Sequence, residues 1–119
     1  MKIIIAGSRS ITDYEFIKNC CANCALPINE PIEIVSGTAN GVDKIGERIA
    51  NDRGLTLHRF PADWNTHGKS AGYIRNQQMA DFADALIAIW DEKSKGTQHM
   101  IDIMRKAGKP IWIFKKETK

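Results

Sequence analysis

Short apolar runs alternate with amphipathic stretches along the whole chain. The runs at residues 3–6, 32–35, 55–60, 85–90 and 111–114 predict five strands, and the continuous run at 3–6 is typical of a strand covered on both faces. Between the runs, apolar residues recur at three- and four-residue spacings, which predicts helices. Strands that alternate with helices predict right-handed βαβ units and a parallel sheet.

Capping residues and glycines locate the expected helices. Thr12 or Asp13 can cap the first, and Gly54 has the position of a C′ glycine behind the second, whose apolar residues are Val42, Ile45 and Ile49. The other expected segments are a loop bracketed by Pro27 and Pro31, a polar connection at 61–73, a helix at 74–82 and a helix from Thr97 to Ala107.

Five strands in this rhythm predict one Rossmann-like α/β domain over residues 1–119, a three-layer αβα arrangement with strand order 3-2-1-4-5. The order reverses between the first and fourth strands. Ligands of open α/β sheets bind in that crevice, beyond the carboxyl ends of the strands.

Three turns that should reach this crevice have the same chemical character. Each joins a strand to a helix start and contains glycine, which lets the backbone approach a ligand. Arg9 can chelate a phosphate, and the turns also offer hydroxyl groups. Any βα loop needs glycine and a capping hydroxyl, but three together favour an anion site. The turns are Gly7-Ser8-Arg9-Ser10, Ser36-Gly37-Thr38-Ala39-Asn40-Gly41 and Ser94-Lys95-Gly96-Thr97.

Composition and charge narrow the class of protein. The chain has 119 residues, of which 43% are hydrophobic and 26% charged, as in ordinary globular domains. No apolar run approaches the roughly 20 residues of a membrane span, so we expect a cytoplasmic protein that contacts no membrane. Two of the three net positive charges lie in residues 115–119, and the nearly neutral remainder makes nucleic acid an unexpected partner.

The three cysteines have two interpretations. Cys21 and Cys24 form a C-x-x-C pair, which raises a redox or metal role. Ile17, Cys20, Cys21 and Cys24 share one helix face, however, and no second ligand pair exists for zinc. We favour core packing and expect no metal.

Familiar nucleotide and hydrolase motifs are missing from the sequence. There is no G-x-G-x-x-G after the first strand and no G-x-S-x-G. Gly68-Lys69-Ser70 looks like the end of a P-loop, but Asp63 stands where its first glycine would be. An ordinary dehydrogenase, a P-loop ATPase and a serine hydrolase are therefore disfavoured.

Five blocks, taken in order, resemble the YspA-like (cpYpsA-related) family of the SLOG superfamily. They are Gly7-Ser8-Arg9, Ser36 to Asp43, Pro61 to Trp64 leading through Gly68 to Gly72 to Arg75 to Met79, Ala83 to Leu86, and Ser94 to Thr97. Relatives include the LOG nucleotide phosphoribohydrolases, the DNA-processing protein DprA and the ThsA sensor domain of an antiphage system. The resemblance implies a Rossmann-like fold with a site for nucleotides, NAD-derived or ADP-ribose-like ones included. Small stand-alone members of this kind occur in bacteria and their phages, and the resemblance leaves the role open among phage or bacterial conflict, bacterial sensing and others.

One position departs from the enzymes of that superfamily. LOG enzymes carry G-G-x-G-T-x-x-E, whose glutamate serves hydrolysis of the N-glycosidic bond. Here Ser94 replaces the second glycine and Met100 replaces the glutamate. Methionine cannot act as an acid or base or stabilise an oxocarbenium ion, so we favour binding over hydrolysis and leave the catalytic residues unassigned.

Other candidate site residues have a functional and a structural interpretation. Arg75 can meet a phosphate and Asn76 can bond a backbone or base edge, or the two can hold the long connection. Asp43 can accept ribose hydroxyls or be a favourable first-turn charge. Trp64 can stack on a base or cover the sheet edge, and Asp84 we take as structural.

Three functions remain to be compared. The first is a sensor or sequestering module for a nucleotide-derived signal, with no required cofactor. The second is a nucleotide or NAD glycosidic-bond hydrolase in which Asp43, Asp63 or Asp91 replaces the missing glutamate. The third is single-stranded DNA binding as in DprA, which the charge distribution disfavours. Trp112 and the last strand can form a homo-oligomer interface, or they can belong to the core.

Overall fold

Five strands alternate with helices through the part of the chain that the structure describes. The computed structural model describes residues 1–24 and 31–116, so most of the loop expected between Pro27 and Pro31 lies outside it. The elements are β1 (Lys2–Gly7), α1 (Tyr14–Ala22), β2 (Glu33–Ser36), α2 (Val42–Asp52), β3 (Thr56–Arg59), α3 (Trp64–His67), a 3-10 turn η1 (Gly68–Ser70), α4 (Ala71–Phe82), β4 (Ala85–Trp90), α5 (Lys95–Lys106) and β5 (Ile111–Lys115).

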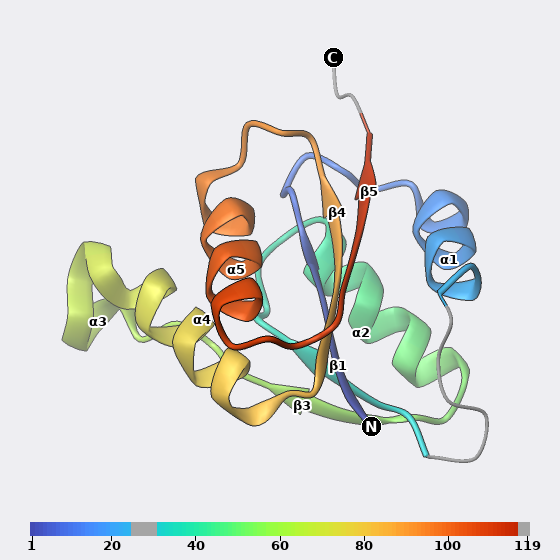
Figure 1. Cartoon of the computed structure of the whole chain (residues 1–119), viewed down its shortest axis with the longest axis horizontal. Helices are drawn as coiled ribbons and strands as arrows, with labels where there is room; N and C mark the ends of the chain where they lie inside the picture. Colours follow the sequence, from blue (N-terminus) through green and yellow to red (C-terminus); the bar gives the residue numbers. More distant parts are fainter. Residues whose placement is uncertain (25–30, 117–119) are drawn as a thin grey trace.

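The strands form one parallel sheet in the order β3-β2-β1-β4-β5, as the sequence predicts. β1 lies in the centre and pairs with β2 on one side and with β4 on the other, in a register that places Ile4 beside Leu86. Helices α1 and α2 cover one face of the sheet and α4 and α5 the other, which gives the three-layer α/β arrangement (Figure 1).

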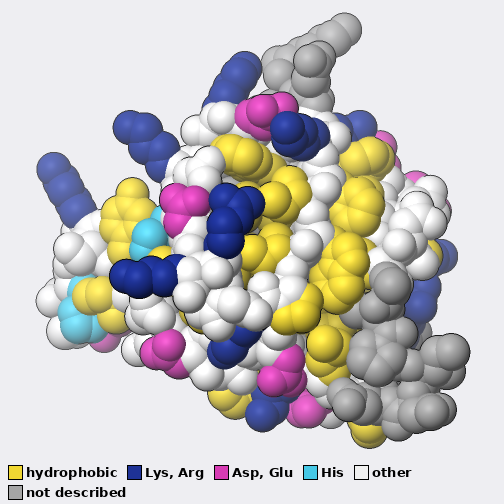
Figure 2. Space-filling view, viewed as in Figure 1, with side chains coloured by type: hydrophobic (Ala, Val, Ile, Leu, Met, Phe, Trp, Pro, Cys, Tyr) yellow, Lys and Arg dark blue, Asp and Glu magenta, His cyan; other side chains and the backbone are white. Residues whose placement is uncertain are grey.

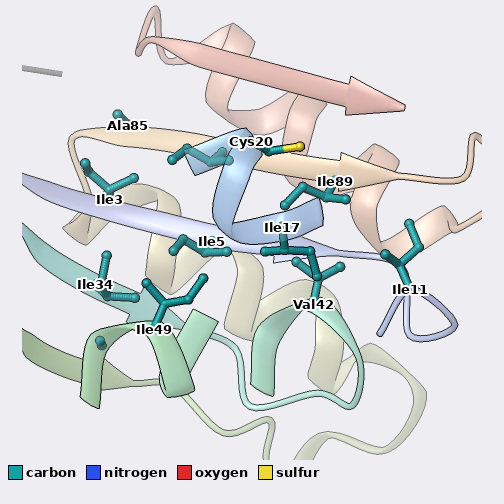
Figure 3. Packing of buried hydrophobic residues seen from close by; sticks show 12 residues of the cluster. Ile3, Ile5, Ile11, Ile17, Cys20, Ile34, Val42, Ile49, Ala85 and Ile89 are labelled. Carbon is teal, nitrogen blue, oxygen red and sulfur yellow. The ribbon is translucent and has the colours of Figure 1, made fainter. Parts of the chain in front are cut away.

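Each face of the sheet has its own hydrophobic cluster. On the α1 and α2 side, Ile3 and Ile5 of β1 meet Ile17 of α1 and Val42 and Ile49 of α2 (Figure 3). On the opposite face, the apolar residues of β1, β2 and β4 meet α4 and α5 through Ile4, Val35, Met79, Leu86, Met100, Ile101 and Met104. Burial of every side chain of β1 from Ile3 to Ala6 confirms a strand covered on both faces.

The cysteines pack into the first cluster. Cys20 is buried, while Cys21 and Cys24 are partly buried against the same cluster. Burial raises the pKa of Cys21 to about 12 and that of Cys24 to about 11, so both thiols stay protonated near neutral pH. This agrees with core packing rather than redox chemistry.

The polar stretch at 61–73 is more helical than the sequence indicates. Asp63 caps α3 by accepting the Thr66 N–H at 3.1 Å, and α4 begins at Ala71 instead of residue 74. The last helix also begins earlier than expected, because Ser94 and not Thr97 is its N-cap, accepting the Thr97 N–H at 3.3 Å. Asp13 caps α1 in the expected way, accepting from Phe16 N–H.

The last strand contributes to the core on both faces of the sheet. Trp112 and Phe114 pack against the first cluster and Ile111 against the second, whereas Ile113 is 36% exposed. Among residues 1–24 and 31–116, no helix has the length and apolar character that would let it cross a membrane.

Candidate functional site

A cleft of about 500 Å³ lies at the carboxyl ends of β1 and β4, where the strand order reverses. Ala6, Met79 and Met100 form its apolar side. The polar side comes from the turns after β1 and β4, from Ala39 and Asp43 near the start of α2, and from α4. Its remaining lining residues are Gly7, Ser8, Arg9, Ser10, Arg75, Asn76, Asp91, Lys93, Ser94, Gly96 and Thr97.

The turns after β1 and β4 are joined directly. Ser8 is buried, its N–H donates to the Ile89 carbonyl at 3.1 Å, and its Oγ accepts the Asp91 N–H at 3.0 Å. Only glycine fits at position 7, because a Cβ there would lie 2.0 Å from the Ile89 carbonyl oxygen. The exposed Arg9 follows this joint and lines the cleft.

The turn after β2 packs next to the residues that line the cleft. Ser36 is buried, donates to Glu47 Oε2 at 2.7 Å and accepts the Thr38 N–H at 3.0 Å, so its hydroxyl joins this turn to α2. Gly41 has a φ of 78°, and its Cα lies against the Arg9 backbone. The sequence-predicted residues Ser36, Gly37, Thr38 and Gly41 therefore shape the site without lining it.

Asp43 is the buried carboxylate of the cleft. Its side chain accepts the Ala39 N–H at 3.2 Å, and the residue is only 5% exposed. Burial raises its pKa to about 6, since the nearby amides and the Arg75 guanidinium compensate only in part. A carboxyl with this pKa can hold or release a proton near neutral pH.

Arg75 and Asn76 of α4 connect three parts of the site. Arg75 donates to the Gly37 carbonyl and, through Nε, to Asn76 Oδ1 at 2.9 Å. Asn76 in turn donates to the Gly96 carbonyl at 3.2 Å and contacts His99 Nδ1 at 3.1 Å. These bonds tie α4 to the turn after β2 and to the first two turns of α5, and none of them reaches the connection at 61–70; both side chains also line the cleft.

The start of α5 brings a helix N-terminus to the cleft. Asp91 accepts the N–H groups of Lys93 and Ser94 at 2.8 and 2.9 Å, which fixes the turn before the helix. Lys95 and Gly96 come next, and first-turn N–H groups have no partner within their own helix. Gly96 and Thr97 line the cleft, whereas the predicted Lys95 is exposed outside the lining.

Positive charge exceeds negative charge in the cleft. The lining includes three cations, Arg9, Arg75 and Lys93, and two carboxylates, Asp43 and Asp91. Asp91 already accepts two backbone N–H groups. A helix N-terminus adds further positive potential. Within the described residues, no group of three His, Cys, Asp or Glu side chains could hold a metal ion.

Trp64 lies beside the cleft rather than in it. It lines a neighbouring pocket with Lys69 and Tyr73, which sequence reasoning did not assign to the site. Lys93 was not assigned to it either, although its place in the loop before the predicted last helix was a usable signal. Asp63 and Asp84 lie elsewhere: Asp63 caps α3, and Asp84 accepts the Lys2 N–H at 2.8 Å.

Comparison with known proteins agrees with this architecture. Residues 1–67 match the model of a family described as "YspA, cpYpsA-related SLOG family". The chain is also similar to the "Gene 61 protein" of Mycobacterium phage D29, with 34% identity over 121 residues and 95% of each chain covered. No solved structure gives a significant match.

Proposed function

The chain belongs to the YspA, cpYpsA-related SLOG family, and on that premise we propose that it binds a nucleotide or a nucleotide-derived small molecule in its cleft. Membership of the SLOG superfamily suggests nucleotide-related binding or processing. The ligand we favour is a NAD-derived or ADP-ribose-like signal, which the protein senses or sequesters.

The observation that carries the proposal is the meeting of cationic side chains and a helix N-terminus in one cleft at the switch point of the sheet. Arg9 and Arg75 can chelate phosphate oxygens, and the first turn of α5 borders the same space through Gly96 and Thr97. The apolar side, with Met79 and Met100, can contact the rest of a ligand.

Thermal denaturation with NAD, ADP-ribose, cyclic nucleotides and nucleoside monophosphates tests the proposal. A ligand at 100 times its Kd adds about 2.7 kcal/mol to the free energy of unfolding, which shifts the melting temperature by several degrees. Arg9→Ala should remove most of this shift. Arg105→Ala is the matched control, because Arg105 is an exposed arginine in the last turn of α5, at the opposite end of that helix. Absence of stabilisation by every ligand at millimolar concentration contradicts the proposal.

One observation favours a second function, hydrolysis of a glycosidic bond. Asp43 is a buried carboxyl in the cleft with a pKa of about 6, which suits a general acid. The other two candidates are less suitable, because Asp63 caps α3 and Asp91 holds the turn before α5.

Chromatography after incubation with nucleoside monophosphates and NAD separates the two functions. Release of a free base that Asp43→Asn abolishes would establish the hydrolase. Binding without turnover, retained in Asp43→Asn, would leave the binding function alone.

A further inference from the structure

A second pocket of about 200 Å³ adjoins the cleft, and we call it the side pocket. It shares four lining residues with the cleft: Arg9, Arg75, Asn76 and Gly96. Its own residues come from α3, η1 and the first turn of α4: Trp64, Lys69, Gly72 and Tyr73. The two spaces therefore meet at a pair of arginines and a helix start, which are the groups best suited to a phosphate.

The side pocket contains exposed aromatic rings. Among residues 1–24 and 31–116, the large hydrophobic side chains classed as exposed are Trp64 at 53%, Tyr73 at 48% and Ile113 at 36%. Two of these three line the side pocket. Over α3 and its neighbours, at the left of Figure 2, hydrophobic and histidine side chains lie at the surface beside those of lysine or arginine. Exposed aromatic rings grouped around one pocket are typical of a binding surface.

Both rings lie next to neighbouring parts of the fold. Trp64 Cη2 lies near the start of α4, where a Cβ at Gly72 would be 3.6 Å from it, an ordinary van der Waals distance. Tyr73 packs edge-on against the His99 ring of α5, with ring centroids 4.6 Å apart and an interplanar angle of 77°. His99 is in turn bonded to Asn76. Rings that are already positioned lose little conformational entropy when a ligand binds.

The charge of the side pocket differs from that of the cleft. Its lining includes three cations, Arg9, Lys69 and Arg75, and no acidic residue, whereas Asp43 and Asp91 line the cleft. An aromatic group joined to a phosphate meets favourable partners throughout this pocket. A sugar phosphate without an aromatic base would leave both aromatic side chains without a stacking partner.

We propose that the side pocket is the subsite for the nucleobase, which stacks on Trp64 and Tyr73 while the phosphate lies between Arg9 and Arg75. This inference rests on the proposed binding function and deepens it, because it restricts the ligand class to phosphates that carry an aromatic base. Base stacking on an aromatic side chain changes binding by about 1–3 kcal/mol per base.

Calorimetric titration can separate base recognition from phosphate recognition. The probes are ribose 5-phosphate and the tightest binder among AMP, GMP, CMP and UMP, each tested on wild type, Trp64→Ala, Trp64→Phe and Ile113→Ala. We expect Trp64→Ala to raise the Kd of the nucleotide roughly 5- to 150-fold and to leave that of ribose 5-phosphate unchanged. Trp64→Phe should retain most of the affinity. Ile113→Ala, which removes the exposed hydrophobic side chain of β5, should change neither Kd.

Two results would overturn the inference while the binding function stands. An unchanged nucleotide Kd in Trp64→Ala would place the base elsewhere. An equal loss for nucleotide and ribose 5-phosphate would give Trp64 a role in shaping the cleft instead. If wild type binds none of the five probes, the inference is wrong, and titration with NAD and ADP-ribose decides the proposed function separately.

Discussion

The polar groups at the two ends of the parallel sheet differ in what surrounds them. At the amino end these groups bond to one another: Lys2 N–H donates to Asp84, and His58 Nε2 lies 2.8 Å from Glu33 Oε1. At the carboxyl end, hydrogen bonds such as that between Asp91 N–H and Ser8 Oγ join the turns that border a cleft of about 500 Å³. The polar groups at the amino end pair with one another, whereas several of those at the carboxyl end line this cleft.

Helix polarity explains the difference. Each helix that follows a strand begins at the carboxyl end of the sheet and ends at the amino end. Lys109 shows the consequence at the amino end, where its Nζ donates to the Ala80 and Ala83 carbonyls at the end of α4. The C-terminus of α4 is thus neutralised by a lysine of the protein itself. At the carboxyl end, the start of α5 borders the cleft instead.

Disrupting the joint between the turns after β1 and β4 should have the largest effect on stability. Gly7→Ala would place a Cβ 2.0 Å from the Ile89 carbonyl oxygen, a backbone atom that cannot rotate away. We expect the free energy of unfolding to fall by about 3 kcal/mol or more, measured by urea denaturation.

Gly96→Ala is the matched control for Gly7→Ala at the same end of the sheet. A Cβ at Gly96 meets nothing within 4 Å, and the residue lies in the first turn of α5. We expect a change of at most about 1 kcal/mol, in the stabilising direction. Equal destabilisation by both changes would show that the turns tolerate added volume equally and that the joint is not tight.

The next largest effect is on how stability depends on pH, which should differ between the two ends of the sheet. Burial raises the pKa of Asp43 from 3.8 to about 6, so the folded protein binds more protons than the unfolded chain between those values, and stability falls as pH rises through them. His58 lowers the pKa of Glu33 at the amino end, so that carboxyl loses its stabilising effect only as pH falls below about 4.5.

Asp43→Asn should therefore become more stable relative to wild type as pH rises. Between pH 4 and 7.5 we expect the difference in unfolding free energy to grow by about 2–3 kcal/mol. Burial also lowers the pKa of His99, which works in the opposite direction in both proteins, so the difference between them is the quantity to measure. A difference independent of pH would mean that Asp43 is solvated and ordinary.

The smallest effect on stability should come from a change at the amino end of the sheet. Lys109→Met removes the hydrogen bonds to the Ala80 and Ala83 carbonyls, which are 2.6 and 2.8 Å long. We expect a loss of about 1–2 kcal/mol in unfolding free energy and no change in the Kd of any ligand that the cleft binds. A changed Kd would show that the two ends are coupled.

The sequence predicts the sheet well because burial leaves a simple pattern. Runs such as 85–90 are apolar at every position, and β4 has those bounds. The stretch at 61–73 has no apolar period, so α3 was missed although Asp63 and Thr66 form a capping pair. The predicted start of α5 was too late, because Gly96 has a low helix propensity and made residues 95–97 look like a loop.

The site was harder to predict than the sheet, because sequence identifies chemistry but not direction. Ser8 directly follows β1 and Ser36 is the last residue of the neighbouring β2, and both carry the same hydroxyl, yet only Ser8 lines the cleft, while Ser36 bonds to Glu47. Tyr73 was missed since its interest comes from His99, a residue distant in sequence that packs against its ring. Contacts of this kind exist only in the folded chain.

The central position of β1 has a consequence for synthesis. Its partner β4 begins about eighty residues later, with Ile3 beside Ala85. Until the ribosome has released that second segment, the newly made first half carries a strand edge that is apolar and unpaired, a template for association with other nascent chains. Long-range pairing of this kind also slows folding. Rapid completion of translation, or a chaperone that shields the nascent β1, should therefore raise the yield of native protein.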